Sequence, residues 1–160
     1  MAHEHPSRDE LRRLLVESST IAVVGASSRP ERPSHGAMKK LLAAGYRVIP
    51  VNPNELEVLG QKAYPSLLAV PEKVDIVDVF RRPEYTPQLA DEAVRIGARA
   101  LWLQLGVESE EARARAERGG LTVVMDDCLG VTHSLLRIPK KQSPKEQEDG
   151  TLDRTTPHPR

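Results

Sequence analysis

Five short apolar runs mark the chain, at residues 20–25, 46–51, 74–80, 98–105 and 121–125. They are mostly continuous rather than alternating, which is typical of parallel strands covered on both faces. Apolar residues recur at helical spacing over residues 34–44, and Pro83 is suited to the first turn of a helix over 83–97. Further helices are predicted over residues 108–118 and 128–136. This alternation of strands and helices predicts an α/β domain built around a parallel sheet.

The two ends of the chain differ from this pattern. Ser7 and Glu10 have the spacing of a capping box, and Leu11, Leu14 and Leu15 follow it, which predicts an amphipathic helix over residues 7–18. We expect a turn or short strand at residues 58–60 and a short helix near 65–69. Beyond Ile138 the chain has almost no apolar residues, so we predict one domain over residues 1–138 and a disordered tail over 139–160.

The predicted fold class is a Rossmann-like, doubly wound, five-stranded parallel sheet with helices on both faces. We expect the strand order 3-2-1-4-5, which places strands 1 and 4 at the switch point. Ligands of such sheets bind outside the carboxyl ends of the strands at that point. The segments predicted to border this crevice are residues 25–33, 52–53, 80–83, 104–106 and 126–128.

Composition narrows the class of partner. Lys and Arg total 23 and Asp and Glu total 23, so no net field recruits nucleic acid or an anionic membrane. No apolar stretch reaches the length of a transmembrane helix, and the N-terminus lacks the apolar core of a secretory signal. The chain has one cysteine, Cys128, which cannot form an internal disulfide. A cytoplasmic location is therefore expected.

The segment after the first strand is the strongest candidate for binding a phosphate. It connects a strand to a helix, where backbone N–H groups and the helix dipole favour an anion. Gly25 allows a tight turn, Ser27 and Ser28 add hydroxyl donors, and Arg29 and Arg32 add charge. The G-x-G-x-x-G spacing is absent, and the alternative is an ordinary loop in which Ser34 caps the helix.

The end of the second strand argues against NAD. NAD-binding domains place an acidic residue there to hold the ribose hydroxyls. This strand ends in Asn52 and Pro53, and the next carboxylate is Glu55. A ligand with a ribose phosphate, such as coenzyme A (CoA) or NADP, suits Arg29 and Arg32 better.

No catalytic or metal site emerges from the remaining chemistry. Asp78 lies within an apolar strand and needs a partner, which we interpret as a structural contact. Cys128 and His133 are close in sequence, but a partly buried thiol and an incidental histidine explain them more simply than a catalytic pair. The histidines lack the paired spacing of metal ligands.

Five segments in order resemble the CoA-binding domain family, specifically its small stand-alone members. The resemblance covers about residues 15–137, and the segments are residues 21–27, 47–53, 74–83, 101–106 and 128–130. That family is related to the N-terminal domains of the succinyl-CoA synthetase alpha subunit and of ADP-forming acyl-CoA synthetases. The acyl-CoA synthetases have a G-P-N-C-L-G turn after the fifth strand, and residues 128–130 resemble its Cys-Leu-Gly. In this chain Met125, Asp126 and Asp127 stand in place of G-P-N.

The resemblance also implies roles for particular residues. The turn of Gly25, Ala26 and Ser27 and the loop after it would hold the CoA phosphates. Asn52 and Pro53 would border the adenosine moiety, as would Phe80, Arg81 and Arg82. Gln104 and Gly106 would lie along the pantetheine arm.

The expected function is non-catalytic binding of CoA or acyl-CoA, since the phosphohistidine and nucleotide-grasping domains of the synthetases have no counterpart in this sequence. The alternatives are an NAD(P)-binding redox sensor or oxidoreductase, and an accessory subunit of an acyl-CoA synthetase. A protein partner or a homo-oligomer is left open.

Overall fold

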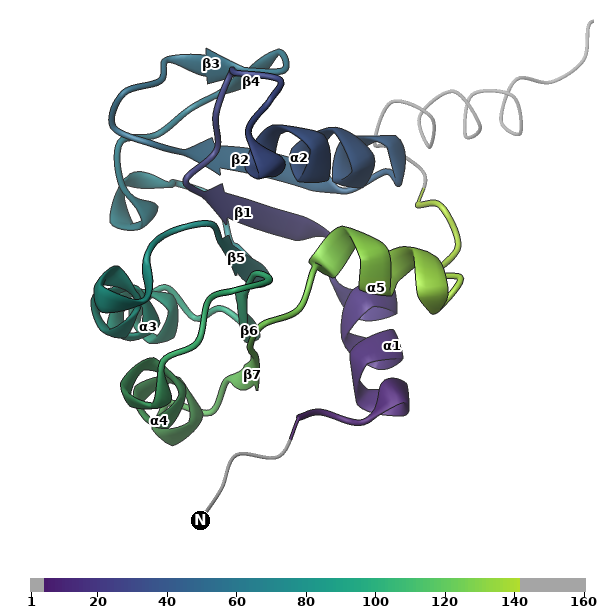
Figure 1. The fold of residues 1–160 in the computed structure, drawn as a ribbon, viewed down its shortest axis with the longest axis vertical. Coiled ribbons are helices and arrows are strands. Elements are labelled where there is room, and N and C mark those ends of the chain that lie inside the picture. The colour runs from purple at the N-terminus through teal and green to yellow at the C-terminus, as the bar shows by residue number, and fades with distance from the viewer. Residues whose placement is uncertain (1–4, 142–160) are drawn as a thin grey trace, which may run out of the picture.

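A five-stranded parallel sheet forms the centre of the protein in the computed structural model, which describes residues 5–141. Its strands are β1 (Thr20–Val24), β2 (Arg47–Val51), β5 (Ile76–Val79), β6 (Ala100–Leu103) and β7 (Thr122–Val124). They run in the order β2-β1-β5-β6-β7 (Figure 1). The predicted Rossmann-like α/β class and its parallel sheet are confirmed.

The predicted strand order 3-2-1-4-5 is wrong, because the third strand of the sheet lies beside the first. β5 pairs with β1, so that Val23 is opposite Asp78. A carboxylate oxygen of Asp75 accepts the backbone N–H groups of Ser19 and Thr20 at 2.8 and 3.0 Å, which fixes the start of β5 against β1. The observed order corresponds to 2-1-3-4-5, and its switch point lies between β1 and β5.

Helices cover both faces of the sheet, as predicted. One face carries α1 (Arg8–Glu17), α2 (Pro33–Ala43) and α5 (Leu129–Leu135). The other carries α3 (Thr86–Arg95), α4 (Glu110–Arg118) and the short 3₁₀ turn η1 (Leu67–Ala69). In Figure 1, α3 and α4 lie on the opposite side of the strands from α1 and α5.

The remaining elements lie in the connections between strands. A small hairpin of β3 (Glu57–Val58) and β4 (Gln61–Lys62) follows β2, and the 3₁₀ turn η2 (Pro83–Tyr85) leads into α3. The Ser7 hydroxyl accepts the Glu10 N–H at 3.1 Å at the start of α1. The predicted N-terminal helix and its cap are therefore present.

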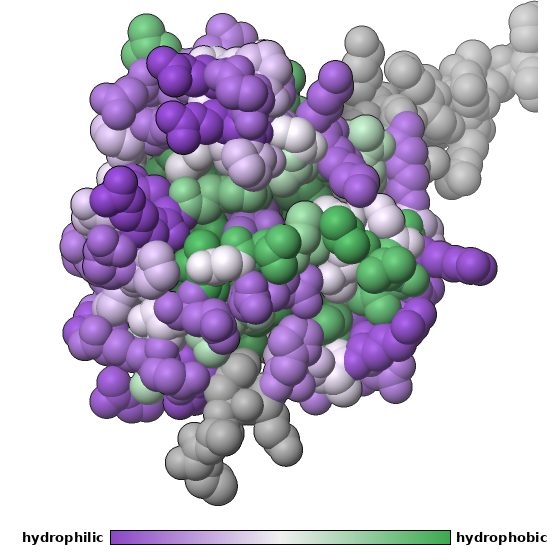
Figure 2. All heavy atoms as spheres, viewed as in Figure 1, coloured by the Kyte–Doolittle hydropathy of each residue, from purple (hydrophilic) through white to green (hydrophobic). Residues whose placement is uncertain are grey.

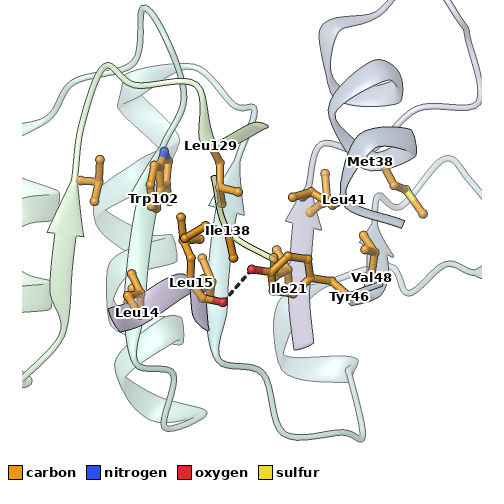
Figure 3. Packing of buried hydrophobic residues seen from close by; sticks show 14 of the residues in the cluster. Leu14, Leu15, Ile21, Met38, Leu41, Tyr46, Val48, Trp102, Leu129 and Ile138 are labelled. Atoms are coloured by element: carbon orange, nitrogen blue, oxygen red, sulfur yellow. Dashed lines mark hydrogen bonds between the residues drawn. The ribbon is translucent and has the colours of Figure 1, made fainter. Parts of the chain in front are cut away.

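Two apolar layers form the core, one on each face of the sheet. The first contains Trp102, Leu15, Ile21 and Leu129, all at or near zero exposure (Figure 3). Within it the Tyr46 hydroxyl donates to the Leu15 carbonyl oxygen at 2.6 Å, which ties α1 to the start of β2. In the second layer, buried alanines of α3 and α4 allow both helices to approach the sheet closely.

The packed chain continues to Lys141. Its backbone N–H donates to the Ala44 carbonyl oxygen at 2.8 Å, and its ammonium group donates to the Val16 carbonyl oxygen. The first three residues of the predicted tail, 139–141, therefore belong to the described structure, whereas the rest of it lies outside the described residues. No helix within residues 5–141 is long and apolar enough to cross a membrane.

Candidate functional site

A large cavity opens at the carboxyl ends of the central strands. Its volume is about 1090 Å³, slightly above the usual range for small-molecule sites. Gly25 from the end of β1 lines it, as do residues 80–83 after β5 and 104–107 after β6. Helix α2 and the start of α5 complete the wall. The cavity therefore lies at the switch point between β1 and β5, where ligands of such sheets bind.

Basic side chains dominate the polar part of the lining, which contains Arg32, Lys39, Lys40, Arg81 and Arg82. None of the lining residues is acidic. Among the described residues, none of these five cations forms an ion pair. The cavity is therefore a concentrated site of positive charge on a chain with no net charge.

Apolar side chains form the other part of the lining. Phe80 and Val107 contribute to the wall, and Leu105 and Val131 are 71% and 48% exposed beside them. Figure 2 shows hydrophobic residues gathered across the middle of this face and over α5, with hydrophilic residues around them. A ligand that is both anionic and partly apolar fits this combination.

Gly25 joins β1 to the loop before α2 at one edge of the cavity, where its backbone lies very close to the backbone of Phe80. Its φ is +92°, and a β-carbon there would lie 2.5 Å from the Phe80 carbonyl oxygen. The Gly25 N–H donates to the Val51 carbonyl oxygen at 2.9 Å. The turn predicted from the sequence therefore holds the ends of three strands together.

The loop after Gly25 directs most of its polar groups away from the cavity. The backbone N–H and the hydroxyl of Ser28 both donate to one carboxylate oxygen of Glu55, at 2.7 and 2.9 Å. The Ser27 hydroxyl accepts the Arg29 N–H at 3.1 Å. The Asn52 amide donates to the Ala26 carbonyl oxygen at 2.8 Å. These groups build the loop, and Glu55 occupies the donors that were expected to face a phosphate.

The structure thus divides the residues predicted from the sequence into two groups. Those that line the cavity are Gly25, Arg32, Phe80, Arg81, Arg82, Gln104 and Gly106. Those that lie outside its lining are Ala26, Ser27, Ser28, Arg29, Asn52 and Pro53. For both groups a role in binding remains a prediction.

Helix α2 contributes residues that the sequence reasoning missed. Lys39 and Lys40 line the cavity, because α2 borders it along its whole length from Pro33 to Ala43. A signal was present: Arg32, Gly36, Lys39 and Ala43 recur at the spacing of one helix face. The small residues of this series, Gly36 and Ala43, leave open space beside the helix. Arg32 and Lys39 therefore face a cavity and not only bulk solvent.

A buried carboxylate lies behind the cavity wall. Asp78 in β5 is fully buried, and its Oδ1 accepts the Gln104 amide N–H at 2.5 Å. Its Oδ2 is buried without a partner. Burial raises the pKa of Asp78 to about 7, and the hydrogen bond from Gln104 opposes the rise. The partner expected for Asp78 therefore exists and is an amide.

The turn before α5 is held by its own aspartates. Asp126 adopts a φ of +54°, and its carboxylate accepts the Gly106 N–H at 2.7 Å. The Asp127 carbonyl oxygen accepts the Trp102 indole N–H at 2.9 Å. This is the turn in which Met125, Asp126 and Asp127 stand in place of G-P-N, and it positions one edge of the cavity.

Cys128 and His133 do not form a pair in this arrangement. Cys128 lines the cavity at the start of α5. The His133 ring instead packs edge-on against Tyr46, with 5.6 Å between the ring centroids. Its burial, followed by the nearby charges of Lys141 and Lys40, lowers the pKa of His133. Among residues 5–141, no cluster of three potential metal ligands is present.

Comparison with known proteins finds one matching family and similar chains. Residues 19–134 match the family described as CoA binding domain. The uncharacterized protein YneT of Bacillus subtilis is 43% identical over 134 residues, which cover 84% of this chain and 99% of YneT. The solved structure of a hypothetical protein from Pyrococcus horikoshii is 38% identical with a TM-score of 0.80, covering 86% of this chain and 99% of that one.

A larger enzyme contains a similar segment. The alpha subunit of acetate–CoA ligase (ADP-forming) I from Pyrococcus furiosus is 25% identical over 154 residues, which cover 86% of this chain but 33% of the subunit. The match to the family spans most of the chain, including all five strands of the parallel sheet. This protein therefore belongs to the CoA binding domain family.

Proposed function

We propose that the protein binds CoA or acyl-CoA in the cavity at the switch point, and that binding rather than catalysis is its activity. One observation carries the proposal: Arg32, Lys39, Lys40, Arg81 and Arg82 converge on one cavity whose lining has no carboxylate. CoA carries a diphosphate and a 3′-phosphate on a long, partly apolar molecule. Charge-assisted contacts to phosphate are the strongest hydrogen bonds that such side chains make.

The apolar part of the cavity supports the same ligand. Phe80 and Val107 give the cavity an apolar surface. The face of an adenine ring, or the aliphatic part of a pantetheine chain, can pack on such a surface without a polar partner. A free inorganic anion would leave this surface unused. The shape and chemistry therefore favour a nucleotide with an extended arm.

The end of β2 does not favour NAD. The Asn52 side chain donates to the Ala26 carbonyl oxygen and accepts the Asn54 N–H at 2.8 Å. The next carboxylate, Glu55, is bound to Ser28. Neither group is directed to a ribose in the way that the acidic residue of an NAD-binding domain is.

The proposal of binding without catalysis rests on where the reactive groups lie. His133 packs on Tyr46, and Asp78 is directed to Gln104 behind the wall. A nucleophile needs a base within hydrogen-bond reach, and Cys128 has no such contact within the described residues.

Thermal denaturation of the purified chain with CoA, NAD and NADP tests the proposal. A ligand at 100 times its Kd stabilises the folded state by about 2.7 kcal/mol, which gives a readily measured rise in Tm. We expect CoA to raise the Tm clearly more than NAD or NADP. An equal or larger rise with NAD or NADP would favour a redox sensor or oxidoreductase and overturn the assignment. Turnover of acetyl-CoA by the protein alone would contradict the absence of catalysis.

A further inference from the structure

The cavity has two different ends, because its cations and its most exposed apolar side chains come from different elements. The five cations belong to α2, to its first flanking residue or to the loop after β5. The most exposed large apolar side chains of the lining, Leu105 and Val131, lie in the loop after β6 and on α5, which follows β7. In the sheet, β6 and β7 lie on the other side of β5 from β1. The two ends meet where α2 contacts α5, since a β-carbon on Gly130 would lie 3.2 Å from Lys40 Cδ.

The exposed face of α5 is apolar although it faces solvent. Val131, Ser134 and Leu135 have the spacing of one helix face, and Leu135 is 68% exposed. The Ser134 hydroxyl donates to a carbonyl oxygen one turn back in the same helix, at 3.2 Å, so its polar group is satisfied within α5. The helix contains no Lys, Arg, Asp or Glu, and its His133 packs on Tyr46. This face therefore offers aliphatic surface and no charge.

Leu105, Val131 and Leu135 together form an apolar surface that leads out of the cavity, which we call the α5 patch. Leu105 and Val131 share the cavity lining, and Leu135 lies one helical turn beyond Val131. Figure 2 shows hydrophobic residues over α5 and across the adjoining middle of this face. A single exposed leucine is common on protein surfaces, whereas neighbouring apolar side chains beside a cavity mark a site for an apolar group.

We propose that the α5 patch binds the aliphatic chain of a fatty acyl-CoA, and that such an acyl-CoA, rather than free CoA, is the preferred ligand. The inference rests on the proposed function and names the substrate class of the same site. An acyl-CoA carries its phosphates towards one end and its acyl chain at the other. The cations attract the phosphates to the end of the cavity near α2 and the loop after β5, which leaves the opposite end of the ligand at the patch. Burial of the acyl chain against the patch removes apolar surface of both partners from water.

The test is calorimetric titration of the full chain with CoA, acetyl-CoA and octanoyl-CoA. Complete burial of a methylene group increases affinity about fourfold, so a chain that lies on a surface and buries half of its area gains about twofold for each methylene. We therefore expect octanoyl-CoA to bind at least about twentyfold more tightly than acetyl-CoA. CoA and acetyl-CoA should bind with similar affinity, because the acetyl group is too short to cover the patch.

Two exposed leucines provide a matched pair of variants. Leu135 belongs to the patch, whereas Leu56 is 91% exposed in the connection after β2 and lies outside the cavity lining. We expect Leu135→Gln to lower the affinity for octanoyl-CoA about fivefold and to leave the affinities for CoA and acetyl-CoA unchanged. Leu56→Gln should change none of the three. Glutamine is similar in size and favours a helix, so thermal denaturation should give both variants nearly the Tm of the wild type.

The outcomes distinguish this inference from the proposed function. Equal affinities for acetyl-CoA and octanoyl-CoA, or an equal loss in the two leucine variants, would overturn the role of the patch and leave CoA binding in place. Dimers of the free chain that dissociate on Leu135→Gln, measured by sedimentation, would assign the patch to a second copy and also overturn it. A wild-type chain that binds none of the three ligands would contradict the proposed function itself, before any variant is made.

Discussion

At the scale of single residues, two arginines of one loop differ in their position relative to the cavity. The loop after β1 contains both Arg29 and Arg32, and the sequence predicts the same phosphate role for each. Both are exposed, but Arg32 lines the cavity at the start of α2, whereas Arg29 lies outside the lining. The two residues are therefore a matched pair for testing where the phosphates bind.

We expect Arg32→Ala to weaken CoA about tenfold and Arg29→Ala to leave its affinity unchanged. A charge-assisted contact to phosphate contributes about 1.5–3 kcal/mol, and an exposed loop arginine contributes little to stability. Calorimetry gives the affinities, and thermal denaturation checks that both variants keep the Tm of the wild type. A larger loss from Arg29→Ala than from Arg32→Ala would move the phosphate site out of the cavity and into the loop.

At the scale of elements, the junction of β1 with α2 depends on one glycine. Gly25 has a left-handed φ and lies against the backbone of Phe80. Gly36 also lines the cavity but stands within α2, and a β-carbon there would meet nothing within 4 Å. One glycine is required by the turn, and the other leaves room beside the helix.

Gly25→Ala should therefore lower the free energy of unfolding by more than about 2 kcal/mol, through strain in φ and the clash with the Phe80 carbonyl. Gly36→Ala should raise it by about 0.5–1 kcal/mol, since alanine favours a helix interior. Urea denaturation measures both values. Gly25→Ala with wild-type stability would show that the strand ends can separate without cost.

At the scale of the whole molecule, Asp78 couples folding to pH. Burial raises its pKa from the ordinary 3.8 to about 7. The folded protein therefore holds this proton more tightly than the unfolded chain does. The stabilisation is fully present below about pH 4 and is lost as the pH rises towards 7. His133, whose pKa is lowered, acts in the opposite sense, because its stabilisation is lost as the pH falls.

Asp78→Asn removes the pH dependence of stability that Asp78 causes and keeps the one that His133 causes. The free energy of unfolding of the variant relative to the wild type should increase from pH 4 to pH 7 and then level off. A pKa rise of this size corresponds to at most about 4 kcal/mol. Urea denaturation of both proteins at pH 5 and pH 8 measures the difference. Parallel pH profiles would show that the buried carboxyl does not titrate in this range.

The sequence by itself determined the elements and the class of fold. All five strands of the sheet and the five α-helices occur where periodicity and turn residues place them, since these signals are local. It also indicated Gly25, Arg32 and the segments after the third and fourth strands, because the ends of parallel strands meet at one edge.

The tertiary structure alone decided which strands are neighbours and which side chains converge. β5 pairs with β1 through the contacts of Asp75 with residues 19–20, more than fifty positions away. Lys39 lines the cavity from a helix face that the sequence leaves open to solvent, while Arg29 lies outside the lining. Gln104 meets Asp78 across adjacent strands, 26 positions apart. Such contacts depend on how distant segments pack, and no local pattern specifies them.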